Sequence, residues 1–190
     1  CVDANLFTGS NDGSSWSDAF FGPNGLQAAL AVSSSGDQIW CAEGTYVPTS
    51  GTSRGASIVL KNGVEIYGGF DGTESALDQR PAHGVAPSVL SGDLAGNDGG
   101  GSMNENSYHV LKGTGTNASA VLDGFFIRGG NANSSGNNNK GGGILCISSS
   151  SPTIRNCTFE GNRCTFGGGA GYISGSAPSF TDCVFDSNTG

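Results

Sequence analysis

The segment from Gly141 to Gly190 contains two copies of one pattern, placed 26 residues apart. The offset recurs at five pairs of identical residues, which are Gly141 and Gly167, Pro152 and Pro178, Cys157 and Cys183, Phe159 and Phe185, and Asn162 and Asn188. A unit of this length is shorter than the roughly thirty residues of a β-α-β crossover, and its many glycines disfavour a helix pair. Units that cannot enclose a core alone bury their apolar residues by stacking. The repeat therefore predicts a solenoid in which each copy forms one turn of short strands.

The preceding part of the chain has the same rhythm with less regularity. Short β-prone runs at 38–42 and 64–70 are separated by bends that contain Gly and Asn, as expected at the corners of a solenoid. A long loop is expected at 71–107, with a strand at 89–90 inside it. Long loops of this kind are usually functional or mobile.

One earlier coil is longer than the final two. Two pairs of residues share an offset of 32, namely Leu122 with Ile154 and Ile127 with Phe159. The six extra residues fall in the polar segment 131–140, and a solenoid tolerates such an insertion because the loop projects outward from the stack. Counting matched strand groups predicts a single domain of roughly six coils. Its expected parts are an N-terminal cap at 1–36, irregular coils at 37–130, and regular repeats at 131–190 with an uncapped C-terminal end.

A single helix is expected near 26–33. Leu26, Ala29 and Leu30 share one face at helical spacing, and alanine is the best helix former. An amphipathic helix at the start of a stack of strands covers the apolar end of the first coil. We therefore expect a short helical cap there.

The composition of the chain limits its partners and its location. Eight Lys and Arg residues oppose 16 Asp and Glu residues, which gives a net charge of −8. A surface this acidic repels phosphate, so nucleic acid is not an expected partner. No run of about twenty apolar residues is present, so no membrane insertion is expected. Six cysteines in a chain rich in Gly, Ser and Asn favour an extracellular or cell-surface location.

The cysteines leave two interpretations open. Cys157 and Cys183 occupy equivalent repeat positions, where inward thiols can stack as small hydrophobes in adjacent coils. A disulfide between them is the alternative, although equivalent positions on neighbouring parallel strands fit the disulfide dihedral poorly. Cys1 is a candidate for an intermolecular bridge or an anchoring modification, and an ordinary strand position is the other interpretation.

Several motifs resemble those of bacterial surface proteins. Gly-Gly-Gly-Ile at 141–144, with Phe-x-x-Asn at 159–162 and 185–188, resembles the GGA(I) and FxxN repeats of polymorphic outer-membrane proteins. Four stretches of this chain resemble the capped beginning of secreted bacterial right-handed parallel β-helix proteins, and they are 2–5, 12–16, 39–46 and 66–70. The resemblance implies an all-β, right-handed, single-stranded parallel β-helix of the pectin-lyase type. It does not imply lyase activity, because this fold hosts enzymes, adhesins and inert stalks alike.

The repeat positions are expected to form structural ladders. Phe159 and Phe185 should stack in one inward column, and Asn162 and Asn188 in another. An Asn amide at a tight bend can bond to the backbone of a neighbouring coil, and identical Asn residues form amide ladders. We therefore expect these residues to stabilise the stack rather than to bind a ligand.

Catalytic residues are hard to assign. Glu160 and Asp186 are expected to be neighbours one coil apart. Inverting glycoside hydrolysis needs two such carboxylates about 6.5–9.5 Å apart. Solvated corner residues are the simpler interpretation of this pair. The basic residues considered for lyase chemistry and both histidines lie outside any motif, and they are Arg128, Arg155, Arg163, His83 and His109. No catalytic residue is assigned, and an enzyme is not the favoured interpretation.

Calcium is the one cofactor for which ligands are present. Asp93, Asn97 and Asp98 place hard oxygen donors at short spacing in a glycine-rich loop, as Ca²⁺ requires. A second and weaker cluster consists of Asp3, Asn5, Asn11 and Asp12. Neither cluster matches the EF-hand pattern, and a solvated Asx turn is the alternative for both.

Two functions follow from these patterns. The favoured one is a non-catalytic extracellular or cell-surface β-helix that serves as a stalk, an adhesin segment or a head-to-tail fibre subunit. An uncapped last coil exposes apolar side chains and unpaired strand edges, so we expect it to be covered. Either further residues of a larger surface protein follow Gly190, or self-association or a neighbouring protein supplies the cap, and the first of these is the favoured alternative. The alternative is a polysaccharide-binding or polysaccharide-degrading β-helix, either a lyase or a glycoside hydrolase, with an aromatic-lined groove. Its candidate platforms are Trp40, Tyr46, Tyr67 and Tyr172.

Overall fold

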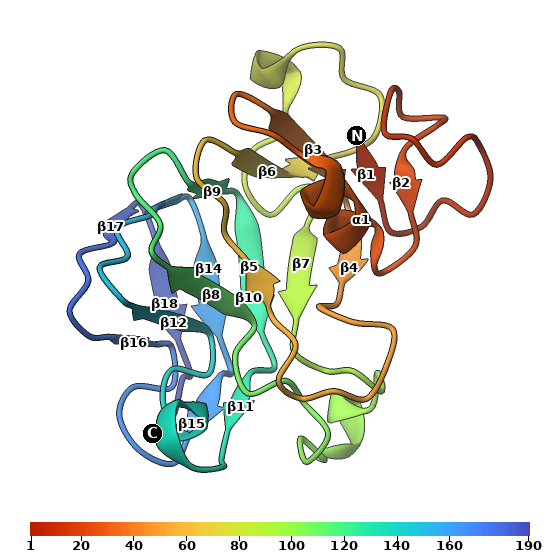
Figure 1. Cartoon of the computed structure of the whole chain (residues 1–190). Coiled ribbons are helices and arrows are strands. Elements are labelled where there is room, and N and C mark those ends of the chain that lie inside the picture. The colour runs from red at the N-terminus through yellow and green to blue at the C-terminus, as the bar shows by residue number, and fades with distance from the viewer.

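The computed structural model describes all 190 residues, and its regular structure is almost entirely parallel β-strand (Figure 1). The first sheet has seven strands, which are β1 (Val2–Asp3), β2 (Phe20–Phe21), β3 (Gln38–Ala42), β6 (Glu65–Phe70), β9 (Val121–Asp123), β13 (Thr153–Arg155) and β17 (Ser179–Thr181). The second sheet has five, which are β4 (Gly44–Tyr46), β7 (Ser88–Ser91), β10 (Phe125–Arg128), β14 (Thr158–Glu160) and β18 (Val184–Asp186).

Two further sheets complete the β-structure. The third sheet has four strands, which are β5 (Ile58–Val59), β8 (Leu111–Thr114), β12 (Ile144–Ile147) and β16 (Gly171–Ile173). A small sheet pairs β11 (Asn131–Ala132) with β15 (Arg163–Cys164). The helical elements are α1 (Gly25–Val32) and the single 3₁₀ turns η1 (Leu77–Gln79), η2 (Asp98–Gly100) and η3 (Gly136–Asn139).

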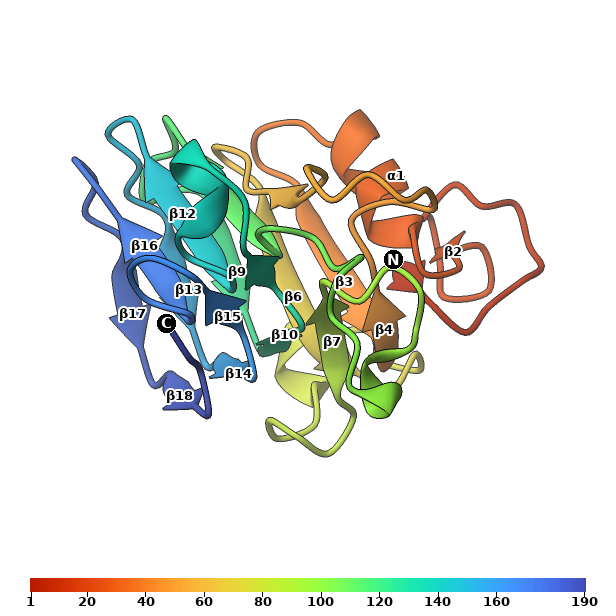
Figure 2. The same cartoon turned by 90° about the horizontal axis from the view of Figure 1, so that it is seen from below.

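The chain visits the first, second and third sheets in turn and then returns to the first. Consequently each strand is hydrogen-bonded to the strand that occupies the same place one turn earlier, and β3, β6, β9, β13 and β17 are consecutive neighbours. Figure 2 shows this succession from the orange N-terminal coils to the blue C-terminal ones. Because every strand pair is parallel and only one α-helix is present, the expected all-β parallel arrangement is confirmed.

The strand register follows the sequence offsets in two sheets and departs from them in the third. Leu122 pairs with Ile154, and Phe159 pairs with Phe185, at the expected offsets of 32 and 26. In the third sheet Ile144 pairs with Gly171, so the offset there is 27. The cause is the bend after β16, which reaches the next strand of the first sheet one residue sooner than the bend after β12 does.

The core consists of aligned columns of side chains between the sheets. In the second sheet Tyr46, Leu90, Ile127 and Phe159 pair in succession and are all completely buried. Ile66, Leu122 and Ile154 form an equivalent column in the first sheet, as do Ile58, Leu111 and Ile144 in the third. Full burial of one such side chain is worth about 1.5–3 kcal/mol. The columns join into one continuous cluster, so the stack has a single core.

Helix α1 covers the N-terminal end of this core. Leu26, Ala29 and Leu30 are buried in the same cluster as Val2 of β1. The helix runs from Gly25 to Val32, one residue earlier at each end than the helical spacing predicts. At its C-terminal end the Lys61 ammonium donates hydrogen bonds to the carbonyls of Leu30 and Ser33, which satisfies groups that a helix end leaves unpaired. No helix of the protein has the length and apolar character needed to cross a membrane.

The strand expected at 89–90 is longer and more central than the sequence indicates. It spans Ser88–Ser91 as β7, lies between β4 and β10 in the second sheet, and is buried throughout. The excursion expected at 71–107 is therefore two separate loops. The first contains η1, and the second contains the glycine-rich turn η2.

The amides of Asn162 and Asn188 connect successive coils. Asn162 is completely buried, and its Oδ1 accepts the N–H of Gly130 at 3.0 Å. Its Nδ2 donates to the carbonyl of Ile127 at 2.9 Å and to Oδ1 of Asn188 at 3.0 Å. Asn188 repeats the pattern, because its Nδ2 donates to the carbonyl of Phe159 at 2.8 Å and its Oδ1 accepts the N–H of Asn162. Each Asn thus binds its own bend to the coil before it.

All six cysteines are free thiols in the structure. Cys157 is buried and Cys183 is half-buried, and each Sγ lies near the carbonyl of a residue in the preceding coil, at 4.0 Å from Leu122 and 3.7 Å from Ile154 respectively. Burial raises the pKa of Cys157 to about 12. Cys157 and Cys183 are thus two free thiols at equivalent places in adjacent coils, and Cys1 is a half-buried free thiol beside the first strand.

His109 is a completely buried polar residue that directly precedes Val110 and strand β8. Its Nδ1 lies 2.9 Å from the carbonyl oxygen of Gly141, and its Nε2 lies 3.3 Å from Oδ1 of Asn138. Burial lowers the pKa of His109 and outweighs the opposing effect of the Gly141 carbonyl. Burial therefore favours the neutral imidazole, against the oxygen acceptors of Gly141 and Asn138 that favour the protonated ring.

The Asn ladder should contribute measurably to stability. Asn162→Ala removes an amide that satisfies Gly130 and Ile127 inside the stack, so we expect the free energy of unfolding to fall by about 2 kcal/mol or more. Asn104→Ala alters an exposed Asn and should change it by less than about 0.5 kcal/mol. Urea denaturation followed by circular dichroism measures both. Equal losses in the two variants would show that the ladder does not stabilise the fold.

Burial of neutral His109 should make stability depend on pH. Because its pKa is lowered on folding, the unfolded chain binds the extra proton more readily, so stability is full above the ordinary pKa of about 6.5 and declines as the pH falls below it. Urea midpoints at about pH 7.5 and about pH 5.5 should differ less in His109→Gln than in the unmodified protein. His83→Gln is the comparison: burial also lowers the pKa of His83, but this residue is exposed whereas His109 is completely buried, so its replacement should remove the smaller part of the difference. An unchanged pH dependence in His109→Gln would contradict the assignment.

Candidate functional site

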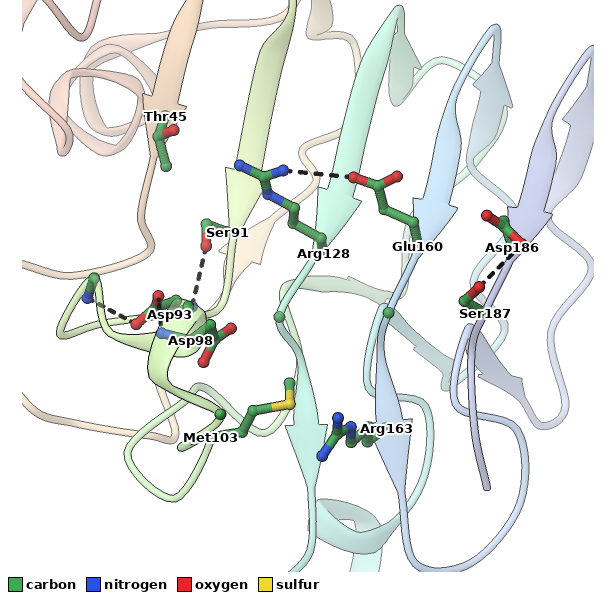
Figure 3. Close-up of a pocket in the computed structure, with 15 residues that line it drawn as sticks. Thr45, Ser91, Asp93, Asp98, Met103, Arg128, Glu160, Arg163, Asp186 and Ser187 are labelled. Carbon is green, nitrogen blue, oxygen red and sulfur yellow. Dashed lines mark hydrogen bonds and ion pairs between the residues drawn. The ribbon is translucent and has the colours of Figure 1, made fainter.

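A groove of about 830 Å³ crosses the outer surface of the second sheet (Figure 3). The ends of β7, β10, β14 and β18 form its floor, and the loop that follows β7 forms one side. Met103 is the only hydrophobic residue of its lining. The groove is therefore a polar surface rather than an apolar pocket.

The strand register places one row of polar side chains along the floor. Residues alternate between the two faces of a strand, so the positions that follow the buried column of Leu90, Ile127 and Phe159 face outward. These positions pair in succession, and they are Ser91, Arg128, Glu160 and Asp186. Figure 3 shows the last three side by side on neighbouring strands, with Arg163 farther along the groove.

Charge along this row is already partly paired. Nη1 of Arg128 lies 3.6 Å from Oε1 of Glu160, with the two side chains 51% and 34% exposed. Ser187 donates a hydrogen bond of 3.1 Å to Asp186. Glu160 and Asp186 occupy paired positions on adjacent strands, as the repeat predicts. On its other side Glu160 forms an ion pair with Arg128. An exposed ion pair of this kind contributes little to stability.

A group of carboxylates borders the groove in the loop after β7. Oxygen atoms of Asp93, Asp98 and Glu105 all lie within 4.8 Å of one another. Asp93 accepts the backbone N–H groups of Gly96, Asn97 and Asp98 at 2.7, 3.1 and 3.0 Å, which folds the loop around its carboxylate. Burial raises the pKa of Asp98, and the charges of Asp93 and Glu105 add to the increase.

The structure changes the membership of the calcium candidates. Of the three predicted residues, Asp93 and Asp98 lie together, whereas Asn97 is exposed and contributes its backbone N–H. Glu105 replaces it, brought back to the cluster by the glycine-rich turn η2. Sequence reasoning missed Glu105 because it lies beyond this turn. The only available signal was an acidic residue just outside a Gly-rich loop.

The second predicted cluster is divided among local turns. Asp3 accepts the N–H of Asn5 at 2.8 Å, and Asp12 accepts the N–H of Ser14 at 2.9 Å. Asn11 accepts the N–H of Phe21 at 3.0 Å. Each side chain therefore shapes its own bend, as the Asx-turn alternative expects.

None of the four candidate aromatic platforms lines the groove. Trp40 stacks on Phe70 with ring centroids 4.9 Å apart, and Tyr46 is completely buried. Tyr67 is 4% exposed, and Tyr172 lies against the ammonium of Lys140 at 4.9 Å. An aromatic-lined sugar site is therefore absent from this surface.

An ionic network that no motif predicts covers the outer surface of the first sheet. Asp123, whose side chain is 4% exposed, receives Nη2 of Arg80 at 2.8 Å and also pairs with Nε of Arg155. Two guanidinium groups offset the cost of burying one carboxylate. Nearby, His83 stacks on Phe126 with ring centroids 4.7 Å apart. Arg155 is therefore part of the ion-pair network around the buried Asp123 carboxylate and does not line the groove.

Comparison with known proteins provides a family but no activity. Residues 9–179 match the family described as "Protein of unknown function (DUF1565)". No curated protein matches the chain, and no solved structure matches it. The match covers most of the sequence, and the parallel sheets agree with it. The chain therefore belongs to the DUF1565 family, a family of parallel β-helix-type domains.

Proposed function

We propose that this protein is a non-catalytic, right-handed parallel β-helix of roughly six coils that forms a structural segment of an extracellular or cell-surface protein. The count includes the rung of β1 and the last turn of β17 and β18. The observation that carries the proposal is the exposed apolar surface of that last turn. Phe185 is 52% exposed, whereas Phe159, its equivalent one coil earlier, is completely buried.

The last coil carries both apolar surface and unpaired backbone. Ile173 and Val184 are 46% and 55% exposed, and strands β16, β17 and β18 each lie at the edge of a sheet. Edge strands present free N–H and C=O groups that template pairing with another chain. A further layer of β-structure would satisfy these groups and cover Phe185. This surface is therefore the proposed site of association.

The other end of the stack argues for one mode of association. Helix α1 buries Leu26 and Leu30 over the first coils. The exposed apolar residues of this part of the chain lie on a loop, on the helix and on β5 rather than together on one coil, and they are Phe7, Val32 and Val59. Head-to-tail stacking of identical chains would therefore set the last coil against an end that is covered by a helix. A second copy joined through the same C-terminal surface satisfies both copies at once, and such isologous contacts give closed dimers. This geometry favours a stalk or adhesin segment over a fibre subunit.

Self-association should depend on the last coil. The protein should show a concentration-dependent dimer in sedimentation velocity, and Phe185→Lys should shift it to monomer because a charge would be buried in the contact. Phe7→Lys is the matched control, since Phe7 is 72% exposed at the other end of the chain and should leave the dimer intact. Circular dichroism checks that both variants fold. Strictly monomeric protein at every concentration, or equal effects of the two variants, would refute the contact.

A second candidate function is polysaccharide binding or cleavage in the groove. It is favoured by the row of Arg128, Glu160 and Asp186. A guanidinium group can bind the carboxylate of an acidic sugar, and most glycosidases use two Asp or Glu residues as their catalytic groups. The Arg128–Glu160 pair and the absence of aromatic platforms count against it. The structural proposal is therefore the better supported of the two.

An activity assay separates the two proposals. We expect no unsaturated or reducing-end products when the protein is incubated with pectic and other acidic polysaccharides, with or without calcium. Products that disappear in Glu160→Gln and Asp186→Asn, but persist in Asp78→Asn at an exposed position outside the groove, would establish the enzyme and overturn the structural proposal.

A further inference from the structure

We propose that the loop between β7 and β8 binds one calcium ion through the carboxylates of Asp93, Asp98 and Glu105, with the amide oxygen of Asn106 as a further ligand. The three carboxylates are contributed by both arms of a glycine-rich turn, and their oxygens lie within 4.8 Å of one another. This spacing allows a single cation to contact all three. The site borders the groove and is independent of the function proposed for it.

The carboxylates keep oxygen lone pairs available for a cation. Asp93 accepts three backbone N–H groups, and a carboxylate has about four acceptor positions. Each oxygen of Asp98 accepts one hydrogen bond from Nδ2 of Asn106, at 3.1 and 3.0 Å. The hydrogen bonds of the loop therefore orient Asp93 and Asp98 without saturating them.

Unpartnered buried oxygens point independently to a missing ligand. Asn106 is completely buried, and its Oδ1 has no hydrogen-bond partner. The same amide is directed at the Asp98 carboxylate through Nδ2, so the orphaned oxygen belongs to a group already in contact with the cluster. Oε1 of Glu105 is likewise inaccessible and unpartnered. Buried polar atoms normally have a partner, and a cation bound here would supply one.

The electrostatics of the cluster favour a positive ligand. Oxygen atoms of the three carboxylates lie within 4.8 Å of one another, and none of these carboxylates forms a salt bridge with a Lys or Arg side chain. A divalent cation would relieve the repulsion among them.

The donor chemistry identifies the ion as calcium. All candidate ligands are oxygens, without His or Cys, which excludes the usual zinc set. Magnesium demands a strict octahedron, whereas calcium accepts six to eight oxygens in irregular geometry. The irregular turn through Gly99, Gly100 and Gly101 suits the larger ion, and water would complete its coordination.

Calcium at this position would fasten the loop to the stack. The second arm of the loop is attached through Asn106, whose Nδ2 donates to the carbonyl of Gly129 at 2.6 Å and whose own carbonyl accepts Nε of Arg54 at 2.6 Å. The first arm is attached by the N–H of Gly92, which donates to the carbonyl of Arg128 at 2.9 Å. An ion held by Asp93 and Asp98 together with Glu105 would join the two arms and fix that side of the groove.

Calcium titration of the whole chain tests the proposal. After treatment with a chelator, isothermal titration with CaCl₂ in about 0.15 M NaCl should show one saturable site, with a dissociation constant of about 10⁻³ M or tighter, as in extracellular calcium modules. Calcium should raise the melting temperature and slow proteolysis within residues 96–104. Asp98→Asn and Glu105→Gln should each weaken binding at least about tenfold, because each removes a charged ligand.

Controls distinguish a site from general screening of the acidic surface. Asp78→Asn removes an exposed charge elsewhere and should bind calcium as the unmodified protein does. Magnesium at the same concentration should bind more weakly. Circular dichroism establishes that each variant is folded without calcium, and Glu105→Gln provides the test if Asp98→Asn is unfolded. No saturable calcium binding, or equal binding by all four proteins, would overturn the proposal.

Discussion

Backbone pairing between successive coils is the interaction on which the rest of this structure depends. In the first two sheets the strands from β3 to β14 have a parallel neighbour on each side, apart from β4, which is an edge strand. This pairing fixes which residues of adjacent coils lie next to each other. Because side chains alternate along a strand, the same register that stacks Leu90, Ile127 and Phe159 inside must align Ser91, Arg128 and Glu160 outside. The core and the groove floor are thus two consequences of one set of hydrogen bonds.

Elements of the solenoid that depend on local repetition could be read from the sequence. The offsets of 26 and 32 gave the pairings of Phe159 with Phe185 and of Leu122 with Ile154, and helical spacing located α1 to within one residue. The register of the third sheet could not be predicted in this way. The bend after β16 is one residue shorter than the bend after β12, which changes the register without changing any of the identical residues of the repeat. Bend geometry, unlike strand periodicity, is set by backbone conformations that the repeat does not encode.

Sites assembled from distant or irregular segments could be foreseen only in part. Asp93 and Asp98 were accessible to sequence reasoning because they share one short loop, whereas Glu105 joins them only through the path of η2. The ion-pair network of Asp123 with Arg80 and Arg155 could not be predicted from the sequence, because its members come from a loop and two different coils. Ion pairs between residues far apart in the sequence produce no periodic pattern, so recognising them requires the three-dimensional structure.

The difference between the two ends of the stack gives the molecule a direction. Helix α1 packs on the core beside β1, whereas β16, β17 and β18 are the edge strands at the opposite end of the three main sheets. A coil inserted at the open side needs to match only its immediate neighbour, because each coil contacts only the coils next to it. Duplication of a repeat there would lengthen the solenoid while the helix and the early coils stay unchanged. The number of coils can therefore change without any change in the contacts that α1 makes with β1 and β2.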